Sequence, residues 1–290
     1  MTRSFAILGL FALLAASGAT AAVTVTDDSG ARIVLPAPAT RIVSLTPGAT
    51  EMLFAAGAGD RVIATVEYSD EPPAAQRIPR IGDAVAIDLE RLIALHPDIA
   101  IIWPGGGNAA QIQKIIRLGI PLYRQEVDAL RDLPQSLRRL GVLAGTSAVA
   151  DSNARSLEQR LSALGRQYAS RRRLTVLLQV WNHPIYTVGG TQLMSDALRL
   201  CGARNVFDDL KVPGPAVDVE AVIARDPDAI VAAAPHGQAG AWLADWKRFP
   251  ALRAVKSGRL IPFDDDSFSR LGPSVVSATE GLCRVLAAAR

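Results

Sequence analysis

Short apolar segments alternate with amphipathic segments along most of the chain beyond residue 40. The apolar runs have the length of buried strands, and the segments between them have the spacing of helices. Predicted strands are 41–45, 61–66, 98–102, 120–124, 174–180, 228–233 and 259–263, and predicted helices are 48–56, 88–95, 108–118, 192–200, 219–224 and 273–288. Two β-prone segments, 23–26 and 31–35, precede them. This alternation is typical of parallel βαβ units and predicts an α/β fold.

One longer helix interrupts the alternation. Beyond residue 147, apolar residues recur at spacings of four and three, with no proline among them: Ala150, Ala154, Leu157, Leu161, Leu164 and Tyr168. The pattern predicts an amphipathic helix of about 24 residues, roughly 36 Å long. The three arginines at 171–173 close it as a solvated helix end. The chain is therefore predicted to form two Rossmann-like lobes, residues 22–146 and 174–290, joined by a single long α-helix at 147–173.

An internal repeat relates the two predicted lobes. Residues 89–98 and 219–228 share Glu, Ile, Ala, Pro and Asp at a constant offset of 130. Each segment reads as a short helix that ends before proline and is followed by an apolar strand. A helix that ends at Pro-Asp and is followed by a strand is common in α/β proteins, and this would explain the pattern within each lobe. It explains less well why Glu90 and Glu220 occupy the same position in the two segments. We expect the lobes to be structural copies related by a pseudo-twofold axis.

The N-terminal segment, residues 1–21, has the pattern of a secretory signal peptide. Arg3 precedes an apolar run at 5–16, and Ala19 and Ala21 are the small residues expected before a cleavage site. The alternative, a membrane anchor, needs about 20 apolar residues. No later segment is apolar for long enough to span a bilayer, so the sequence predicts an exported, soluble protein.

Composition and charge exclude some classes of function. Hydrophobic residues make up 49% of the 290 residues and charged residues 20%, which is typical of a folded chain. Lys and Arg number 31 against 28 Asp and Glu, a net charge of +3, so no nucleic-acid partner is expected. Cys201 and Cys283 lie in the exported part, where two cysteines most often pair. The alternative is two buried thiols that never meet, and it stays open at this point.

Sequence motifs of catalysis and metal binding are absent from the chain. It has no nucleophile elbow, no Walker phosphate loop, no dinucleotide-binding glycine motif after the first strand and no H-E-x-x-H. The segment 105–108 reads as a tight strand-to-helix turn rather than an anion site. His96, His183 and His236 are scattered, and the aspartates at 264–266 read as a solvated loop. We therefore expect neither an enzyme nor a metal site.

The few aromatic residues are distributed unevenly. They make up 5% of the chain, yet Tyr68, Trp103, Trp181 and Phe268 each follow a predicted strand closely, and Tyr186 lies in the loop after Trp181. In α/β sheets, ligands bind outside the carboxyl ends of the strands. The alternative role is packing beneath loops. Gathered together, these rings would line a cleft between the lobes that suits a large, planar, mostly apolar ligand.

Several motifs along the chain match those of a known family. They are Thr46-Pro47 with Thr50-Glu51, Tyr68-Ser69-Asp70 with Pro72-Pro73, Leu89-Glu90-Arg91, Trp103-Pro104-Gly105-Gly106 with Asn108, Cys201-Gly202 with Asn205-Val206-Phe207, and the tail from Asp266 to Cys283. In these the chain resembles the periplasmic vitamin B12-binding proteins of cobalamin ABC importers. The resemblance implies a helical-backbone periplasmic receptor without a cofactor, expected to be monomeric. It would capture cobalamin or a related corrinoid between its lobes and deliver it to the permease dimer of an ABC transporter.

The resemblance also assigns roles to individual residues. Tyr68 matches the tyrosine that stacks on the corrinoid, and the other implied ligand-binding residues are Trp103, Trp181, Tyr186, Asp266, Ser267, Phe268, Ser269 and Arg270. Glu90 and Glu220 match the two carboxylates that bind arginines of the permease. Cys201 and Cys283 match the family's disulfide. Where the family carries tryptophan, this chain has Ala84, Gly214 and Ser267, so a bound corrinoid would lose three ring faces.

Two other functions remain as alternatives. A receptor of the same fold could bind haem or a ferric siderophore through Tyr68, Tyr186 or His183. An exported α/β hydrolase is the alternative from another class, but no nucleophile with a nearby base can be named.

Overall fold

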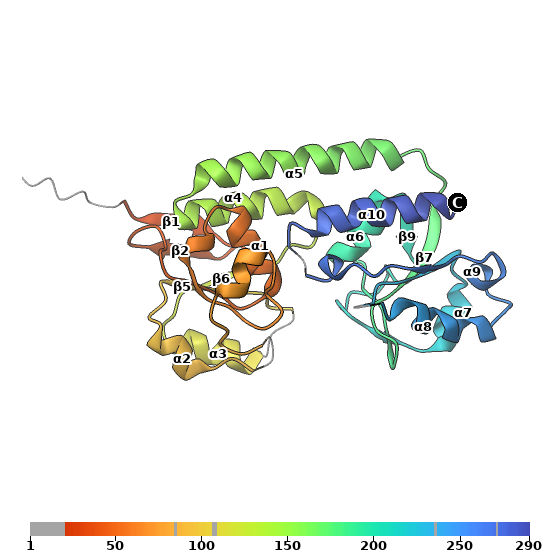
Figure 1. Cartoon of the computed structure of the whole chain (residues 1–290), viewed down its shortest axis with the longest axis horizontal. Helices are drawn as coiled ribbons and strands as arrows, with labels where there is room; N and C mark the ends of the chain where they lie inside the picture. The colour runs from red at the N-terminus through yellow and green to blue at the C-terminus, as the bar shows by residue number, and fades with distance from the viewer. Residues whose placement is uncertain (1–20, 84–85, 106–108, 235–236, 271) are drawn as a thin grey trace, which may run out of the picture.

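A computed structural model describes residues 21–83, 86–105, 109–234, 237–270 and 272–290. The chain forms two α/β lobes, and the helix α5 (Ser147–Tyr168) runs along one side of both (Figure 1). Nearly all of the predicted signal peptide, together with Ala84, residues 106–108 and His236, lies outside the described residues. The predicted α/β class with two lobes is confirmed.

The N-terminal lobe is built on a parallel four-stranded sheet of order β4-β3-β5-β6. Its strands are β3 (Ile42–Ser44), β4 (Val62–Ala64), β5 (Ile99–Ile102) and β6 (Leu122–Arg124). Its helices are α1 (Pro47–Ala55), α2 (Leu89–Ala94), α3 (Ala109–Arg117) and α4 (Leu133–Ala144), with short 3₁₀ turns η1 (Gly59–Arg61), η2 (Pro73–Arg77) and η3 (Leu130–Asp132). The antiparallel hairpin of β1 (Val23–Thr26) and β2 (Arg32–Leu35) precedes the sheet.

The C-terminal lobe repeats this topology. Its parallel sheet has the order β12-β11-β7-β9, formed by β7 (Leu174–Gln179), β9 (Ala203–Asn205), β11 (Ala229–Ala232) and β12 (Leu260–Pro262). Its helices are α6 (Leu193–Leu200), α7 (Val219–Arg225), α8 (Ala239–Ala244), α9 (Arg253–Lys256) and α10 (Val275–Ala288), with η4 (Asp245–Arg248), η5 (Asp266–Phe268) and a small pair of strands, β8 (Ile185–Tyr186) and β10 (Ala216–Val217). If the four strands of each sheet are numbered along the chain, their order across the sheet is 2-1-3-4 in both lobes.

The repeated sequence segment has the same local structure in each lobe. Helices α2 and α7 begin after Asp88 and Asp218, whose carboxylates each accept a backbone N–H from the first helical turn. Just before the following strand, Asp98 accepts the N–H groups of Thr40 and Arg41, and Asp228 accepts the N–H of Thr175. Each aspartate thereby ties the start of the third strand to the start of the first strand of its sheet, in both copies.

Helix α5 packs against α4 through the predicted apolar stripe. All six residues of that stripe are buried. Close contact depends on Gly141 of α4, since a Cβ atom there would clash with the Cβ of Ala150. Helix α4 is a feature that the sequence interpretation missed; it belongs to the N-terminal lobe, and α5 is the helix that joins the two lobes.

The linking helix is shorter than predicted. It ends at Tyr168 instead of continuing to residue 173, and the arginines at 171–173 follow it in a turn. The chain must reverse there to enter β7, and the turn is held by Arg290, whose guanidinium donates to the carbonyls of Arg172, Cys201 and Gly202. The prediction that these arginines close the helix was therefore wrong.

Cys201 and Cys283 form a disulfide, as predicted. Cys201 caps the end of α6 and Cys283 lies inside α10; both are fully buried, with their Cα atoms 4.7 Å apart. The bridge fixes the C-terminal helix to the second lobe. Within the described parts of the chain, no helix combines the length and the apolar character needed to cross a membrane.

Candidate functional site

Some of the predicted ligand-binding residues of the C-terminal lobe line one pocket of about 220 Å³. It is lined by Val180, Trp181, Met194, Ala233, Ala234, Asp265, Asp266, Phe268 and Ser269. Four of the predicted residues are among these, and they come from the segments that follow β7 and β12. Ala233 and Ala234 follow β11, the strand between β7 and β12, so the carboxyl ends of three strands build this wall, as expected for a parallel sheet.

Trp181 is the exposed ring of this pocket, with 51% of its surface accessible. It packs edge-to-face on Trp242, with ring centroids 6.0 Å apart, and its backbone pairs with Tyr186, which is 37% accessible. The loop is held by the buried Gln179, which donates to Asn182 Oδ1 at 2.8 Å and accepts from Trp246 Nε1 at 2.8 Å. A ring this exposed on a fixed loop can stack on a flat ligand.

Phe268 lines this pocket, but its ring is not exposed. It is only 1% accessible and packs edge-to-face on Phe263, with centroids 5.3 Å apart. It supports the pocket wall from behind because the 3₁₀ turn η5 points its ring into the core. The same turn is capped by Asp265, whose Oδ1 accepts the Ser267 N–H at 3.0 Å.

Tyr68 is the most exposed large hydrophobic residue of the N-terminal lobe among the described residues, with 76% of its surface accessible. Its backbone has a φ of 65°, a left-handed conformation that is strained for a residue other than glycine. Strain retained at an exposed aromatic residue is typical of functional sites. Trp103 follows β5 and is half-buried. Neither residue lines the pocket around Trp181.

Ser267 and Arg270 line a second cavity, of about 470 Å³, which lies between the lobes. Its other lining residues are Glu51, Phe54, Ala55, Glu71, Pro72, Pro273 and Ser274. Helix α1 and the loop after Tyr68 supply one side of the cavity, and the segment leading into α10 supplies the other. Of the predicted site residues, then, Ser267 and Arg270 are brought together with residues of the opposite lobe.

Glu51 is a polar residue of this cavity to which the sequence interpretation assigned no role, although it belongs to the Thr50-Glu51 motif. Burial raises the pKa of its carboxyl group, opposed by hydrogen bonds from Ser274 and by the charge of Arg270. A buried carboxylate cannot be told from a surface one on a short helix by sequence alone. Its neighbour Ser274 is 223 residues away in the chain.

Glu90 and Glu220, the predicted docking residues, occupy matching places. Each is the second residue of its helix, α2 or α7, and each is exposed. Both helices lie on the side of the molecule away from α5 (Figure 1). Two carboxylates at equivalent points of two equivalent lobes suit a partner that is itself twofold symmetric.

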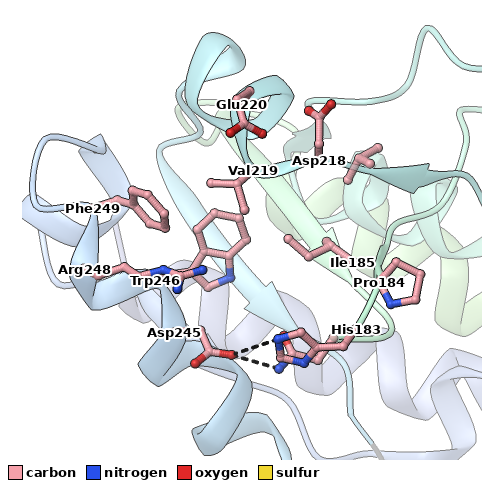
Figure 2. Close-up of a pocket in the computed structure, with 12 residues that line it drawn as sticks. His183, Pro184, Ile185, Asp218, Val219, Glu220, Asp245, Trp246, Arg248 and Phe249 are labelled. Atoms are coloured by element: carbon pink, nitrogen blue, oxygen red, sulfur yellow. Dashed lines mark hydrogen bonds and ion pairs between the residues drawn. The ribbon is translucent and has the colours of Figure 1, made fainter.

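A third pocket, of about 380 Å³, lies beside Glu220. Figure 2 shows Val219, Trp246 and Phe249 on one side of it and Ile185, Pro184 and His183 on the other. Asp245 accepts a hydrogen bond from Asn182 at 3.0 Å and lies 3.8 Å from His183 Nε2. The sequence interpretation missed this pocket because it depends on η4, which was not predicted.

The described residues include no group of three or more His, Cys, Asp or Glu side chains that could hold a metal ion. Asp264 accepts the N–H of Ala239, and Asp265 caps η5, so these two aspartates of the 264–266 segment serve backbone hydrogen bonding.

Comparison with known proteins defines the class. Residues 42–266 match the family model of the periplasmic binding proteins, and the chain belongs to that family. A relative from Photorhabdus laumondii subsp. laumondii, named vitamin B12-binding protein, is 35% identical over 85% of this chain and 87% of its own length. A Vibrio cholerae protein of the same name is 32% identical over 87% of this chain and 90% of its own.

Solved structures agree with this assignment. The periplasmic vitamin B12-binding protein BtuF of Vibrio cholerae has a TM-score of 0.80 and 33% identity, over 87% of this chain and 98% of its own. A periplasmic haem-binding protein from Pseudomonas aeruginosa has a TM-score of 0.72 and 25% identity, over 86% of this chain and 92% of its own.

Proposed function

We propose that this protein captures cobalamin or a related corrinoid between its two lobes and delivers it to the permease of an ABC importer. The observation that carries the proposal is an exposed aromatic ring on each lobe, Tyr68 on one and Trp181 on the other. Flat rings exposed beyond strand ends suit a large planar ligand. The relatives named vitamin B12-binding protein support a corrinoid as that ligand.

Binding in this proposal is mostly apolar burial and stacking, with Asp266 and Arg270 fixing the orientation of the ligand. Gly214 is exposed, with no heavy atom within 4 Å of where its Cβ would lie, so the tryptophan expected there from the family would have room. The protein would work in the periplasm after removal of residues 1–21. It would act as a monomer, hold no cofactor and make or break no bond.

A haem or ferric siderophore is the second candidate ligand. The exposed phenol of Tyr68 favours it, since tyrosine can ligate haem iron. The structural likeness to a haem-binding receptor also supports it.

Thermal unfolding with each ligand separates the candidates. The protein is heated with cyanocobalamin, with haemin and with a ferric hydroxamate siderophore. At a concentration one hundred times the dissociation constant, the true ligand stabilises the fold by about 2.7 kcal/mol. That corresponds to a rise in Tm of roughly 5 to 10 °C. We expect this rise with cyanocobalamin; no rise with it, together with a rise with haemin or the siderophore, would overturn the proposal.

The docking assignment predicts a separation of binding from transport. We expect Glu90→Ala combined with Glu220→Ala to leave the affinity for cyanocobalamin within about twofold, because exposed charges contribute little to the affinity for a ligand that is held mostly by apolar burial. Delivery to the reconstituted permease should fall at least tenfold, since roughly 1.4 kcal/mol of lost docking energy suffices for that. Asp60→Asn, an exposed charge on η1, is the control. A double variant that loses ligand affinity would contradict the assignment.

A further inference from the structure

We infer that Glu51 and Arg270 form a subsite for a primary carboxamide in the cavity between the lobes, and that this subsite rejects ligands that present a carboxylate there. The inference rests on the proposed function, because it assigns one polar part of the corrinoid to one place. It adds a residue that determines specificity, Glu51, to the candidate site.

One oxygen of Glu51 fixes the side chain across the boundary between the lobes. Oε2 accepts the Ser274 N–H at 3.2 Å and the Ser274 hydroxyl at 2.5 Å. The approach is possible because residue 272 is glycine: a Cβ there would lie 2.6 Å from Oε2 and 3.0 Å from Cδ. The carboxylate of an N-terminal helix is therefore locked against the segment that leads into α10.

The other oxygen of Glu51 is left for a ligand. Oε1 is buried and has no hydrogen-bond partner, and Glu51 as a whole is only 6% accessible. The nearest cation is Arg270, whose Nη1 lies 3.9 Å from Oε1, too far for a hydrogen bond. A buried acceptor without a partner is costly. A donor that enters the cavity would remove that cost.

The charges around the cavity select the kind of donor. Glu51 and Glu71 both line it, and so does Arg270. A primary carboxamide offers N–H groups to Glu51 Oε1 and a carbonyl oxygen to the Arg270 guanidinium, so it satisfies both side chains. A carboxylate could pair with Arg270, but it has no hydrogen to donate to Glu51 Oε1 and would meet the two carboxylates of Glu51 and Glu71. Corrinoids carry neutral carboxamides around the ring, whereas haem carries carboxylates, so the subsite would discriminate between these two ligand classes.

Calorimetric titration at pH 7.5 tests the inference with matched ligands. The probes are cyanocobalamin and its three monocarboxylic acids, in each of which one peripheral propionamide is hydrolysed. Wild-type protein should bind at least one acid about tenfold or more weakly than cyanocobalamin, a difference of roughly 1.4 kcal/mol. For the Glu51→Gln variant, the ratio of the dissociation constant of that acid to the dissociation constant of cyanocobalamin should fall to about threefold or less. Glu280→Gln, which loses an ion pair with Arg160 away from the cavity, should keep the wild-type ratio.

A second variant keeps the test decisive if Glu51→Gln does not fold. Glu71 is exposed and lines the same cavity, so Glu71→Gln should fold normally and lower the ratio about two- to threefold. Unchanged ratios in the variants that fold, or no discrimination by the wild type, would overturn the inference alone. Failure of the wild type to bind cyanocobalamin at all would instead overturn the proposed function.

Discussion

Replacing Cys201 and Cys283 together with alanine should lower the free energy of unfolding by about 4 to 5 kcal/mol, the loss expected for a disulfide that closes a loop of this length. The bridged residues are 82 apart in sequence, so the bridge restricts a large part of the unfolded chain. Alanine is chosen because both sites are fully buried and a serine hydroxyl would lack partners. Equilibrium unfolding in urea measures the change.

Wild-type protein treated with a strong reductant is the matched control for this variant. It should lose a comparable amount of stability, while its folded spectrum stays the same in the absence of urea. A loss below about 1 kcal/mol in both experiments would contradict the chain-entropy argument, which expects several times more.

Removal of either exposed ring should weaken cyanocobalamin binding strongly. We expect Tyr68→Ala and Trp181→Ala each to raise the dissociation constant about 10- to 100-fold, because stacking of one aromatic ring on a planar base contributes roughly 1 to 3 kcal/mol. Tyr68 and Trp181 lie on different lobes, so the double variant should lose nearly the sum of the two effects. Calorimetric titration measures all three.

Conservative and distant substitutions show whether the effect is local. Tyr68→Phe and Trp181→Phe keep a ring and should retain most of the affinity. Phe249→Ala removes a ring from the pocket beside Glu220, shown in Figure 2, and should leave the affinity unchanged. If Phe249→Ala weakened binding while Tyr68→Ala did not, the ligand would occupy that pocket instead.

Much of the fold follows from periodicity. The stripe from Ala150 to Tyr168 was assigned correctly because six apolar residues on one helix face leave a single way to bury them. The buried strands were found because each is a short continuous apolar run. The repeat at an offset of 130 reflects the same strand order in both sheets.

The missing elements are those whose pattern is short or mixed. Strand β9 has only three residues, Ala203–Asn205, and is recognised as a strand only beside β7. Helix α4 carries Gly141 in its interior, and an interior glycine argues against a helix when the sequence is read alone. Burial against α5 outweighs this local preference.

The site was predictable where strand ends bring residues together, and less so where burial decides their roles. Trp181 and Asp266 line one pocket because the carboxyl ends of parallel strands meet at the same edge. No sequence pattern indicates that Phe268 turns into the core, since a 3₁₀ turn of three residues sets its direction. Likewise, the contact of Glu51 with Ser274 depends on how the lobes pack.

A crystal structure of the protein grown with cyanocobalamin would show where the ligand binds. We expect one corrinoid per chain, held between the lobes, with Tyr68 against one part of the ligand and Trp181 against another. Cyanocobalamin bound outside the space between the lobes, or protein that crystallises without it at saturating concentration, would contradict capture between the lobes.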